Sequence, residues 1–298
     1  MRKTIEREAF AKINIFLRVT GRRDNGYHDL FSVFQEIDIS DTIEVTIDDD
    51  MPFDIGLEGS VCEDKTKDLC FRAADAFYRK AGVRPQFTSI RAVKNIPSQA
   101  GLGGGSSDAA CILKILQEYY GDPLDDGEFL EMAASLGADV PFFLNGGTCL
   151  CEGIGDIVTP LPSCAGLPVI LIKPSEGVST GICFNKVDSE YVPYDQEGYR
   201  RQILSAFSDG KTVPLERIRK VSPIMVNDLQ RPAEELVPRI GQLVSLLEDS
   251  GSVFSLMTGS GSSVFGIFDS VEKRDRAYEG LIAGGLPEDC QIFRTSMI

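Results

Sequence analysis

A glycine-rich segment between a predicted strand and a predicted helix is the feature that most constrains the fold. Residues 97–107 read PSQAGLGGGSS, with four glycines in five positions. A strand near 87–94 precedes them, and an apolar helical pattern runs from Ser106 to Gly121. Glycines allow close approach of the backbone to a ligand, and a helix start offers unpaired N–H groups with partial positive charge. The segment therefore indicates an anion site, where the hydroxyl groups of Ser106 and Ser107 could bind phosphate or magnesium.

The segment differs from two other phosphate-binding loops. A Walker A loop requires a lysine after the glycines, and none follows here; the GxGxxG pattern requires a glycine where Ser106 stands. The alternative is an ordinary strand-to-helix turn made flexible by glycine, with Ser106 as the helix cap. The density of glycines, flanked by Pro97 and two serines, favours the phosphate-binding interpretation.

The charge of the chain limits its partners. The 298 residues include 30 Lys and Arg against 45 Asp and Glu, a formal net charge of −15. Nucleic acids and anionic membranes are bound largely by neutralising phosphates, so this balance argues against both. The length suits two domains. The Pro- and Gly-rich stretch at 160–168 is the best boundary, which predicts domains 1–162 and 163–298.

The cysteines and the N-terminus predict a cytoplasmic protein. No CxxC pair or metal-ligand spacing occurs among the eight cysteines, which lie at positions 62, 70, 111, 149, 151, 164, 183 and 290. Most lie in apolar runs, as expected of buried thiols in a reducing compartment. Charged residues interrupt the N-terminus, so no signal peptide is expected, and no apolar run is long enough to span a bilayer. The single histidine, His28, excludes a His-cluster metal site.

Hydrophobic periodicity predicts an α+β fold with mixed sheets. Residues 9–19 alternate as a strand does, with Lys12 and Asn14 on the same side. Two further strand-like runs, at 31–39 and 42–47, are separated by Asp41. Helices are expected near 67–81, 196–208, 232–249 and 271–283, and strands near 168–173, 253–257, 263–268 and 290–296.

Five segments together resemble a known kinase superfamily. The pattern P-x-x-x-G-L-G-x-x-S-S at the start of a helix resembles the ATP-binding motif of the GHMP kinases (galactokinase, homoserine kinase, mevalonate kinase and phosphomevalonate kinase). The longer form GLGGGSSDAA is similar to the branch that acts on 4-diphosphocytidyl-2-C-methyl-D-erythritol. The remaining segments agree in order: AKINIFLRVTGRRDNGYHDL at 11–30, LGADVPFFL at 136–144, VNDLQ at 226–230 and TGSGSSVFGIF at 258–268.

The resemblance implies a fold and an activity. The expected fold has a ribosomal-protein-like N-terminal domain that binds ATP and a ferredoxin-like C-terminal domain, with the substrate in the cleft between them. The expected reaction is ATP-dependent phosphorylation of the 2-hydroxyl group of 4-diphosphocytidyl-2-C-methyl-D-erythritol, with magnesium, in non-mevalonate isoprenoid (terpenoid) biosynthesis. The expected partners are ATP and a cytidine diphosphate-alcohol, and the expected state is a monomer or weak homodimer.

The resemblance also implies two catalytic residues. Asp139 would accept the proton of the hydroxyl group, and Lys12 would orient Asp139 and stabilise developing negative charge. A nearby cation also keeps an aspartate ionised. Each residue has a simpler alternative: Lys12 as a solvated lysine on a half-exposed strand, and Asp139 as a helix cap before Pro141.

The remaining implied site residues bind the two substrates. For ATP they are Lys94 and the whole loop: Pro97, Ser98, Gln99, Ala100, Gly101, Leu102, Gly103, Gly104, Gly105, Ser106 and Ser107. For the second substrate they are Asn14, Tyr27, His28, Thr180 and Phe184, with the Tyr27–His28 pair and Phe184 around the cytosine ring. The alternatives are a turn aromatic for Tyr27, a surface imidazole for His28 and a core ring for Phe184.

One position departs from the pattern of the family. Asp68 stands where an asparagine commonly contacts adenine, and an ionised carboxylate cannot donate a hydrogen bond. Backbone groups could replace that contact. Three other functions remain open: a superfamily kinase acting on mevalonate or homoserine, a regulatory nucleotide-binding protein without catalysis, and a nucleic-acid-binding module, which the acidic charge disfavours.

Overall fold

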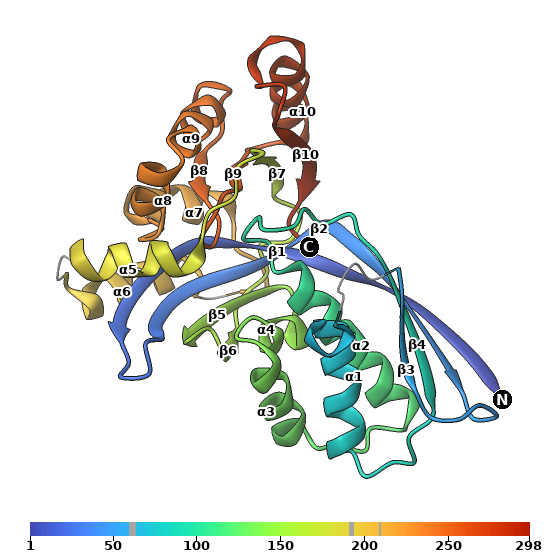
Figure 1. Cartoon of the computed structure of the whole chain (residues 1–298). Coiled ribbons are helices and arrows are strands. Elements are labelled where there is room, and N and C mark those ends of the chain that lie inside the picture. Colours follow the sequence, from blue (N-terminus) through green and yellow to red (C-terminus); the bar gives the residue numbers. More distant parts are fainter. Residues whose placement is uncertain (60–63, 191–193, 209) are drawn as a thin grey trace. The chain divides into compact units, whose positions relative to one another are not determined.

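The computed structural model describes residues 1–59, 64–190, 194–208 and 210–298, and it divides into two compact units (Figure 1). The first unit comprises Met1–Ala11, Ile39–Ile96 and Gly103–Asn145, and the second Lys12–Asp38, Pro97–Leu102 and Gly146–Ile298. Two long strands, β1 (Arg2–Arg22) and β2 (His28–Asp48), each contribute residues to both units. Because the units interleave along the chain, the domain boundary expected at 162/163 stays a prediction.

The first unit combines helices with the C-terminal half of β2. That half pairs antiparallel with β4 (Phe87–Val93), which pairs parallel with β3 (Ile55–Glu58). The helical segments are η1 (Lys65–Lys67), α1 (Leu69–Lys80), α2 (Gly104–Tyr119), α3 (Asp126–Leu136) and α4 (Val140–Asn145). The buried faces of α1 and α2 pack against each other, and α2 also packs against α4.

The predicted break at Asp41 is wrong. The runs expected at 31–39 and 42–47 form the single strand β2, and Asp41 is fully buried within it. The carboxylate of Asp41 accepts hydrogen bonds from the backbone N–H groups of Asn95 (2.6 Å) and Ile96 (2.8 Å). These donors compensate for the burial of the charge, so the strand continues through an aspartate that would otherwise favour a turn.

The second unit contains strands of two sheets. In the first, the N-terminal half of β2 pairs with β5 (Thr148–Gly153), and β5 pairs with β6 (Ile157–Pro160). The other is antiparallel, in the order β10-β7-β9-β8. Its strands are β7 (Pro168–Lys173), β8 (Phe254–Met257), β9 (Val264–Ile267) and β10 (Gln291–Ser296). These four strands were predicted, with bounds that differ by at most one residue.

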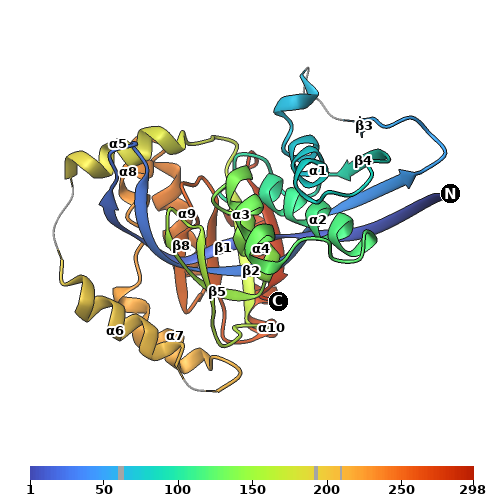
Figure 2. The same ribbon diagram turned by 90° about the horizontal axis from the view of Figure 1, so that it is seen from below.

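The helices of the second unit pack on this second sheet and on one another. They are α5 (Thr180–Glu190), α6 (Gln196–Ala206), α7 (Leu215–Val221), α8 (Gln230–Leu236), α9 (Arg239–Asp249) and α10 (Val271–Gly280), with short turns η2 (Ser222–Ile224) and η3 (Leu281–Gly285). Helix α9 contacts β8 and β9, and α10 contacts β7 and β10. Helices α6 and α7 lie side by side (Figure 2). The predicted single helix at 232–249 is wrong. The structure has two helices there, α8 and α9, because Pro238 lacks the N–H group that a continuous helix would need.

The cysteines behave as the sequence predicts. Of the seven that the structure describes, all are free and only Cys290 is not buried; Cys62 lies outside the described residues. Burial raises the pKa of the Cys149 and Cys164 thiols to about 12, so neither is a reactive thiolate. No helix in the described part of the chain is long and apolar enough to cross a membrane.

Candidate active site

The glycine loop packs directly on a second glycine turn. In the second unit, a Cβ atom placed on Gly101 would lie 2.4 Å from the carbonyl oxygen of Thr258, and one on Gly259 would lie 3.1 Å from the carbonyl oxygen of Gly101. Gly101 also has a φ of +74°, in the left-handed region that favours glycine. The loop at 97–102 and the turn at 258–261 therefore touch backbone to backbone, which explains the glycines in both motifs.

The glycine loop leads into an uncapped helix. In the first unit, Gly103 is the N-cap of α2, no side chain caps the helix, and the N–H group of Ser107 donates to the carbonyl of Gly103 (2.9 Å). Ser106 lies within the first turn, so its interpretation as the helix cap is wrong. The first N–H groups of a helix have no intrahelical acceptor, and the helix dipole is positive there. This geometry suits a phosphate group.

The turn that carries Asp139 lies beside the start of α2 within the same unit. A Cβ atom on Gly137 would lie 3.9 Å from Oγ of Ser106, and the N–H group of Val140 donates to the carbonyl of Gly137 (3.1 Å). Asp139 is half-buried and immediately precedes α4. That place agrees with both interpretations of Asp139, as a helix cap and as a residue that faces a reacting group.

Lys12 is not a solvated surface lysine. It is 4% exposed, its Nζ donates to Oδ1 of Asn14 (2.8 Å), and its ammonium lies 4.6 Å from the centre of the Phe34 ring. Its backbone N–H group also donates to the carbonyl of Leu102 (3.0 Å). The middle of β1 and the end of the glycine loop are thereby joined in the second unit, with a buried positive charge next to them.

Two residues of this network were given no role from the sequence. The backbone N–H group of Asn14 donates to Oγ1 of Thr258 (2.9 Å), and Nδ2 of Asn227 donates to the carbonyls of Met257 and Gly259 (both 2.8 Å). Thr258 and Asn227 are buried. Thr258 lies in the motif TGSGSS and Asn227 in the motif VNDLQ, and these motifs were the sequence signal from which a role for the two residues could have been predicted. Asn227 holds the turn against which the glycine loop packs.

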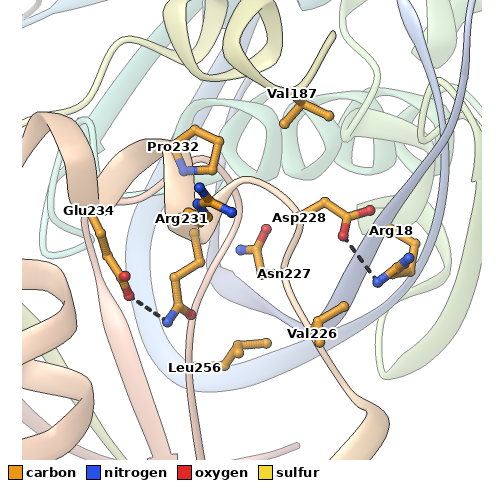
Figure 3. A pocket seen from close by; sticks show the side chains of 10 residues that line it. Arg18, Val187, Val226, Asn227, Asp228, Arg231, Pro232, Glu234 and Leu256 are labelled. Carbon is orange, nitrogen blue, oxygen red and sulfur yellow. Dashed lines mark hydrogen bonds and ion pairs between the residues drawn. The ribbon is translucent and has the colours of Figure 1, made fainter. Parts of the chain in front are cut away.

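A cavity of about 410 Å³ is lined in part by the VNDLQ segment (Figure 3). It is lined by Arg18, Val187, Val226, Asn227, Asp228, Gln230, Arg231, Pro232, Glu234 and Leu256. Figure 3 shows Arg18 facing Asp228, and Nη1 of Arg18 lies 3.2 Å from Oδ1 of Asp228. Nε2 of Gln230 donates to Oε1 of Glu234 (2.8 Å). Burial raises the pKa of Asp228, and Arg18 opposes that shift. Besides this ion pair, Oδ2 of Asp228 accepts from the N–H group of Val19 (2.8 Å), so the segment is also fixed to β1.

Lys94 is held between two buried carboxylates in the first unit. Its Nζ donates to Oδ2 of Asp41 and to Oδ2 of Asp108. Burial acts to lower the pKa of Lys94, but these two carboxylates outweigh it and raise the pKa. Lys94 is therefore more than an exposed lysine at a strand end. Asp68, which the resemblance placed where an asparagine is expected, is the N-cap of α1, and its carboxylate accepts from the N–H group of Cys70 (2.9 Å).

Asp108 is expected to make stability depend on pH. Burial raises its pKa to about 7 from an ordinary 3.8, with Lys94 opposing and Asp41 adding to the shift. The folded protein therefore binds this proton more tightly than the unfolded chain, and the free energy of unfolding falls as the pH rises between these values. We expect a loss of about 4 kcal/mol across this range.

Urea unfolding of the wild type and of Asp108→Asn at several pH values measures this contribution. The variant cannot ionise, so its stability should change less between about pH 4 and pH 7 than that of the wild type. The same pH dependence in both proteins would contradict the assignment, because another group would then be responsible.

The expected cytidine-binding residues lie in the second unit. The His28 imidazole is stacked on the Phe184 ring, with centroids 4.7 Å apart and an interplanar angle of 20°. His28 is 7% exposed, so its interpretation as a surface imidazole is wrong, whereas Tyr27 is 58% exposed. Phe184 is partly buried against the hydrophobic core. Oγ1 of Thr180 lies 2.7 Å from Oγ of Ser260, beside the second glycine turn.

The expected site residues form separate groups in the two units. The second unit brings Lys12, Asn14 and Leu102 together, and it stacks His28 on Phe184. Pro97, Ser98 and Gln99 line another cavity of this unit, of about 360 Å³. The first unit contains Lys94, residues 103–107 and Asp139.

Comparison with known proteins decides the family. Two family models match the chain: the GHMP kinases N terminal domain over residues 68–147 and the GHMP kinases C terminal domain over residues 212–285. A 4-diphosphocytidyl-2-C-methyl-D-erythritol kinase of Desulfitobacterium hafniense (strain Y51) is 38% identical over 280 residues, which cover 93% of this chain and 91% of that relative. The chain belongs to the 4-diphosphocytidyl-2-C-methyl-D-erythritol kinase family.

Other members and solved structures agree with this kinase family. A relative with the same name from Clostridium novyi (strain NT) is 37% identical over 275 residues, 91% of this chain and 93% of that protein. A crystal structure of 4-(cytidine 5'-diphospho)-2C-methyl-D-erythritol kinase matches with a TM-score of 0.78 at 31% identity, over 98% of this chain and 99% of that one. A homoserine kinase from Cytophaga hutchinsonii, at 16% identity and a TM-score of 0.74, covers 99% of this chain and 95% of its own, and agrees in fold.

The family confirms two predictions. The predicted α+β fold is that of the two-domain GHMP kinases. The predicted class of enzyme is also confirmed, because the members are small-molecule kinases, and a kinase of this family uses ATP as its co-substrate.

Proposed function

We propose that this kinase transfers the γ-phosphoryl group of ATP to the 2-hydroxyl group of 4-diphosphocytidyl-2-C-methyl-D-erythritol. The observation that carries the proposal is the 38% identity, over 93% of the chain, with a kinase named for that substrate. The product would enter non-mevalonate isoprenoid synthesis. A mevalonate or homoserine kinase activity is less well supported, since the homoserine kinase structure is only 16% identical.

ATP would be held by its phosphates on the glycine loop. We propose that the nucleotide contacts Lys94 and residues 97–107, with the triphosphate at the uncapped start of α2. The N–H groups there donate without adding charge, so they can bind an anion on a chain whose formal net charge is −15. Lys94 supplies a positive charge that Asp41 and Asp108 keep in place.

The chemical step would depend on positioning and electrostatics. We propose that Asp139 accepts the hydroxyl proton while the oxygen attacks the γ-phosphorus atom. The bond from this phosphorus to the β–γ bridging oxygen breaks, so ADP leaves and the phosphoryl group passes directly to the substrate. Lys12 would stabilise the negative charge on the attacking oxygen and the transferring group. Its burial makes this attraction stronger than it would be in water. Asn14 accepts from Lys12 (2.8 Å) and would orient both the lysine and the substrate.

The cytidine end of the substrate would bind near Tyr27, His28, Thr180 and Phe184. Tyr27 offers an exposed ring, and Phe184 a ring whose one face is covered by His28. Base–aromatic stacking contributes about 1–3 kcal/mol per base where it has been measured by substitution. A cytosine ring could therefore supply much of the affinity that separates this substrate from alcohols without a nucleotide.

Magnesium fits the groups at the start of α2. Its preferred ligands are oxygens, and with nucleotides it usually keeps water and phosphate ligands besides one or two from the protein. Ser106 and Ser107 offer hydroxyl groups, and Oδ1 of the adjacent Asp108 is buried without a hydrogen-bond partner among the described residues. When bound, the ion would neutralise part of the phosphate charge. We propose that one of these oxygens reaches it.

The domain bounds, the oligomeric state and the cellular compartment are also proposed. We propose an ATP-binding domain at 1–162 and a second domain at 163–298, in a monomer or weak homodimer. The free, buried cysteines support a reducing compartment, as in the cytoplasm.

The test is ATP turnover against a panel of acceptor alcohols, with and without a cytidine diphosphate group. Turnover should require the cytidine diphosphate group, and mevalonate and homoserine should be poor acceptors. Equal turnover of an alcohol that lacks this group would refute the substrate assignment. ATP binding without turnover of any acceptor would instead favour a regulatory protein.

A further inference from the structure

The carboxylate of Asp188 connects one helix to both ends of a turn. In the second unit, Arg22 ends β1 and His28 begins β2, while Asp188 belongs to α5, beside that turn (Figures 1 and 2). Nε2 of His28 lies 2.7 Å from Oδ1 of Asp188, and Nη1 of Arg22 lies 3.2 Å from Oδ2. Each carboxylate oxygen therefore holds one end of the turn, and the turn between them contains Tyr27.

The same helix face carries the ring that stacks on His28. Phe184 and Asp188 are four residues apart in α5, so they share one face of the helix. The His28 imidazole contacts both: it stacks on the Phe184 ring and hydrogen-bonds to Asp188. The imidazole is only 6% exposed. A rotation of this ring would disturb both contacts, so Asp188 is linked to the Phe184 ring through His28.

We propose that Asp188 is a positioning residue that sets the orientation of Phe184 and Tyr27 for the base of the cytidine substrate. This inference rests on the proposed function for the identity of the base. Nε2 of His28 is engaged by Asp188, so this nitrogen holds α5 in place instead of contacting a base. One face of Phe184 is covered by His28, and a base can stack only on the rest of its surface. The carboxylate thus determines where the aromatic groups meet a substrate.

Two substitutions separate the charge of Asp188 from its shape. Asp188→Asn keeps the size and an acceptor oxygen for His28 but removes the attraction to Arg22. Asp188→Ala removes both contacts. A hydrogen bond between a charged group and its partner contributes more than one between neutral groups, so the effect should grow from Asn to Ala.

Steady-state kinetics give the first test. For Asp188→Ala we expect the KM of the cytidine diphosphate-alcohol to rise about 5- to 20-fold, with kcat and the KM of ATP within about 2-fold. Lys186→Gln is the matched control, since Lys186 lies on the same helix in an ion pair with Glu235, and it should leave all three constants unchanged. An unchanged substrate KM, or a fall in kcat and ATP affinity of the same size, would overturn the proposal.

A second test needs no substrate, so it distinguishes failure of this proposal from failure of the proposed function. The chain contains no tryptophan, so Phe184→Trp introduces a single indole at this position. Acrylamide should quench its fluorescence weakly, and more strongly once Asp188→Ala is added. Equal quenching in both proteins would refute the positioning role, even if the wild type phosphorylates the cytidine substrate. If Phe184→Trp does not fold, the kinetic comparison alone decides.

Discussion

Asp139→Ala is expected to lower kcat by about 10²- to 10⁴-fold, the usual contribution of a positioned general base. The reason is that this substitution removes the group proposed to accept the proton of the attacking hydroxyl group. ATP affinity should change little, because the loop at 97–107 and Lys94 are unaltered. Turnover measured under saturating ATP and acceptor, together with ATP affinity measured by calorimetry, separates the two effects.

Asp125→Ala is the matched control for the cap interpretation of Asp139. Asp125 is the N-cap of α3 and accepts from the N–H group of Glu128 (2.8 Å). Loss of such a cap costs about 0.5–2 kcal/mol of stability. We therefore expect Asp125→Ala to be less stable in urea and fully active. If Asp139→Ala shows only a similar loss of stability and keeps its kcat, Asp139 is a cap and has no catalytic role.

The parts of the fold that the sequence predicts well are those set by local pattern. The alternation at 9–19 places Lys12 and Asn14 on the same side of β1, and the structure joins them by a hydrogen bond of 2.8 Å. The glycine-rich segment and the helix after it could also be predicted, because glycine marks backbone with positive φ and a helix start has its own local sequence pattern. The start of α2 at Gly104, two residues before the predicted start, lies within the ordinary uncertainty of helix ends.

What the sequence does not predict depends on partners far along the chain. Asp41 resembles a strand break until its carboxylate meets the N–H groups of Asn95 and Ile96, more than 50 residues later. Lys12 resembles a surface lysine because a buried amine requires acceptors and packing that no local pattern reveals. The role of Thr258 could not be predicted for the same reason, because its hydrogen-bond partner Asn14 lies 244 residues away in the sequence. Motif order across the whole chain compensated for part of this loss, because it marked the segments that contain Lys12 and Thr258 as motifs of the kinase family.

Gly101→Ala is expected to disrupt the glycine loop more than any other single methyl addition there. Its φ of +74° is strained for alanine, and the added Cβ would lie 2.4 Å from the carbonyl oxygen of Thr258, a backbone atom that cannot rotate away. Left-handed backbone costs about 1–2 kcal/mol and overpacking about 1–3 kcal/mol. We therefore expect a loss of about 2–5 kcal/mol in urea unfolding followed by circular dichroism, and a large loss of ATP affinity.

Gly105→Ala provides the control for stability, because it adds the same methyl group four residues away. No atom lies within 4 Å of its added Cβ, and no positive φ applies to it. An alanine within a helix is favoured over glycine by about 0.5–1 kcal/mol, so this variant should be as stable as the wild type or slightly more stable. Equal stability of the two variants would mean that the loop does not depend on its contact with Thr258. A destabilised Gly101→Ala beside a stable Gly105→Ala would instead locate the requirement for glycine at the backbone contact between the two motifs.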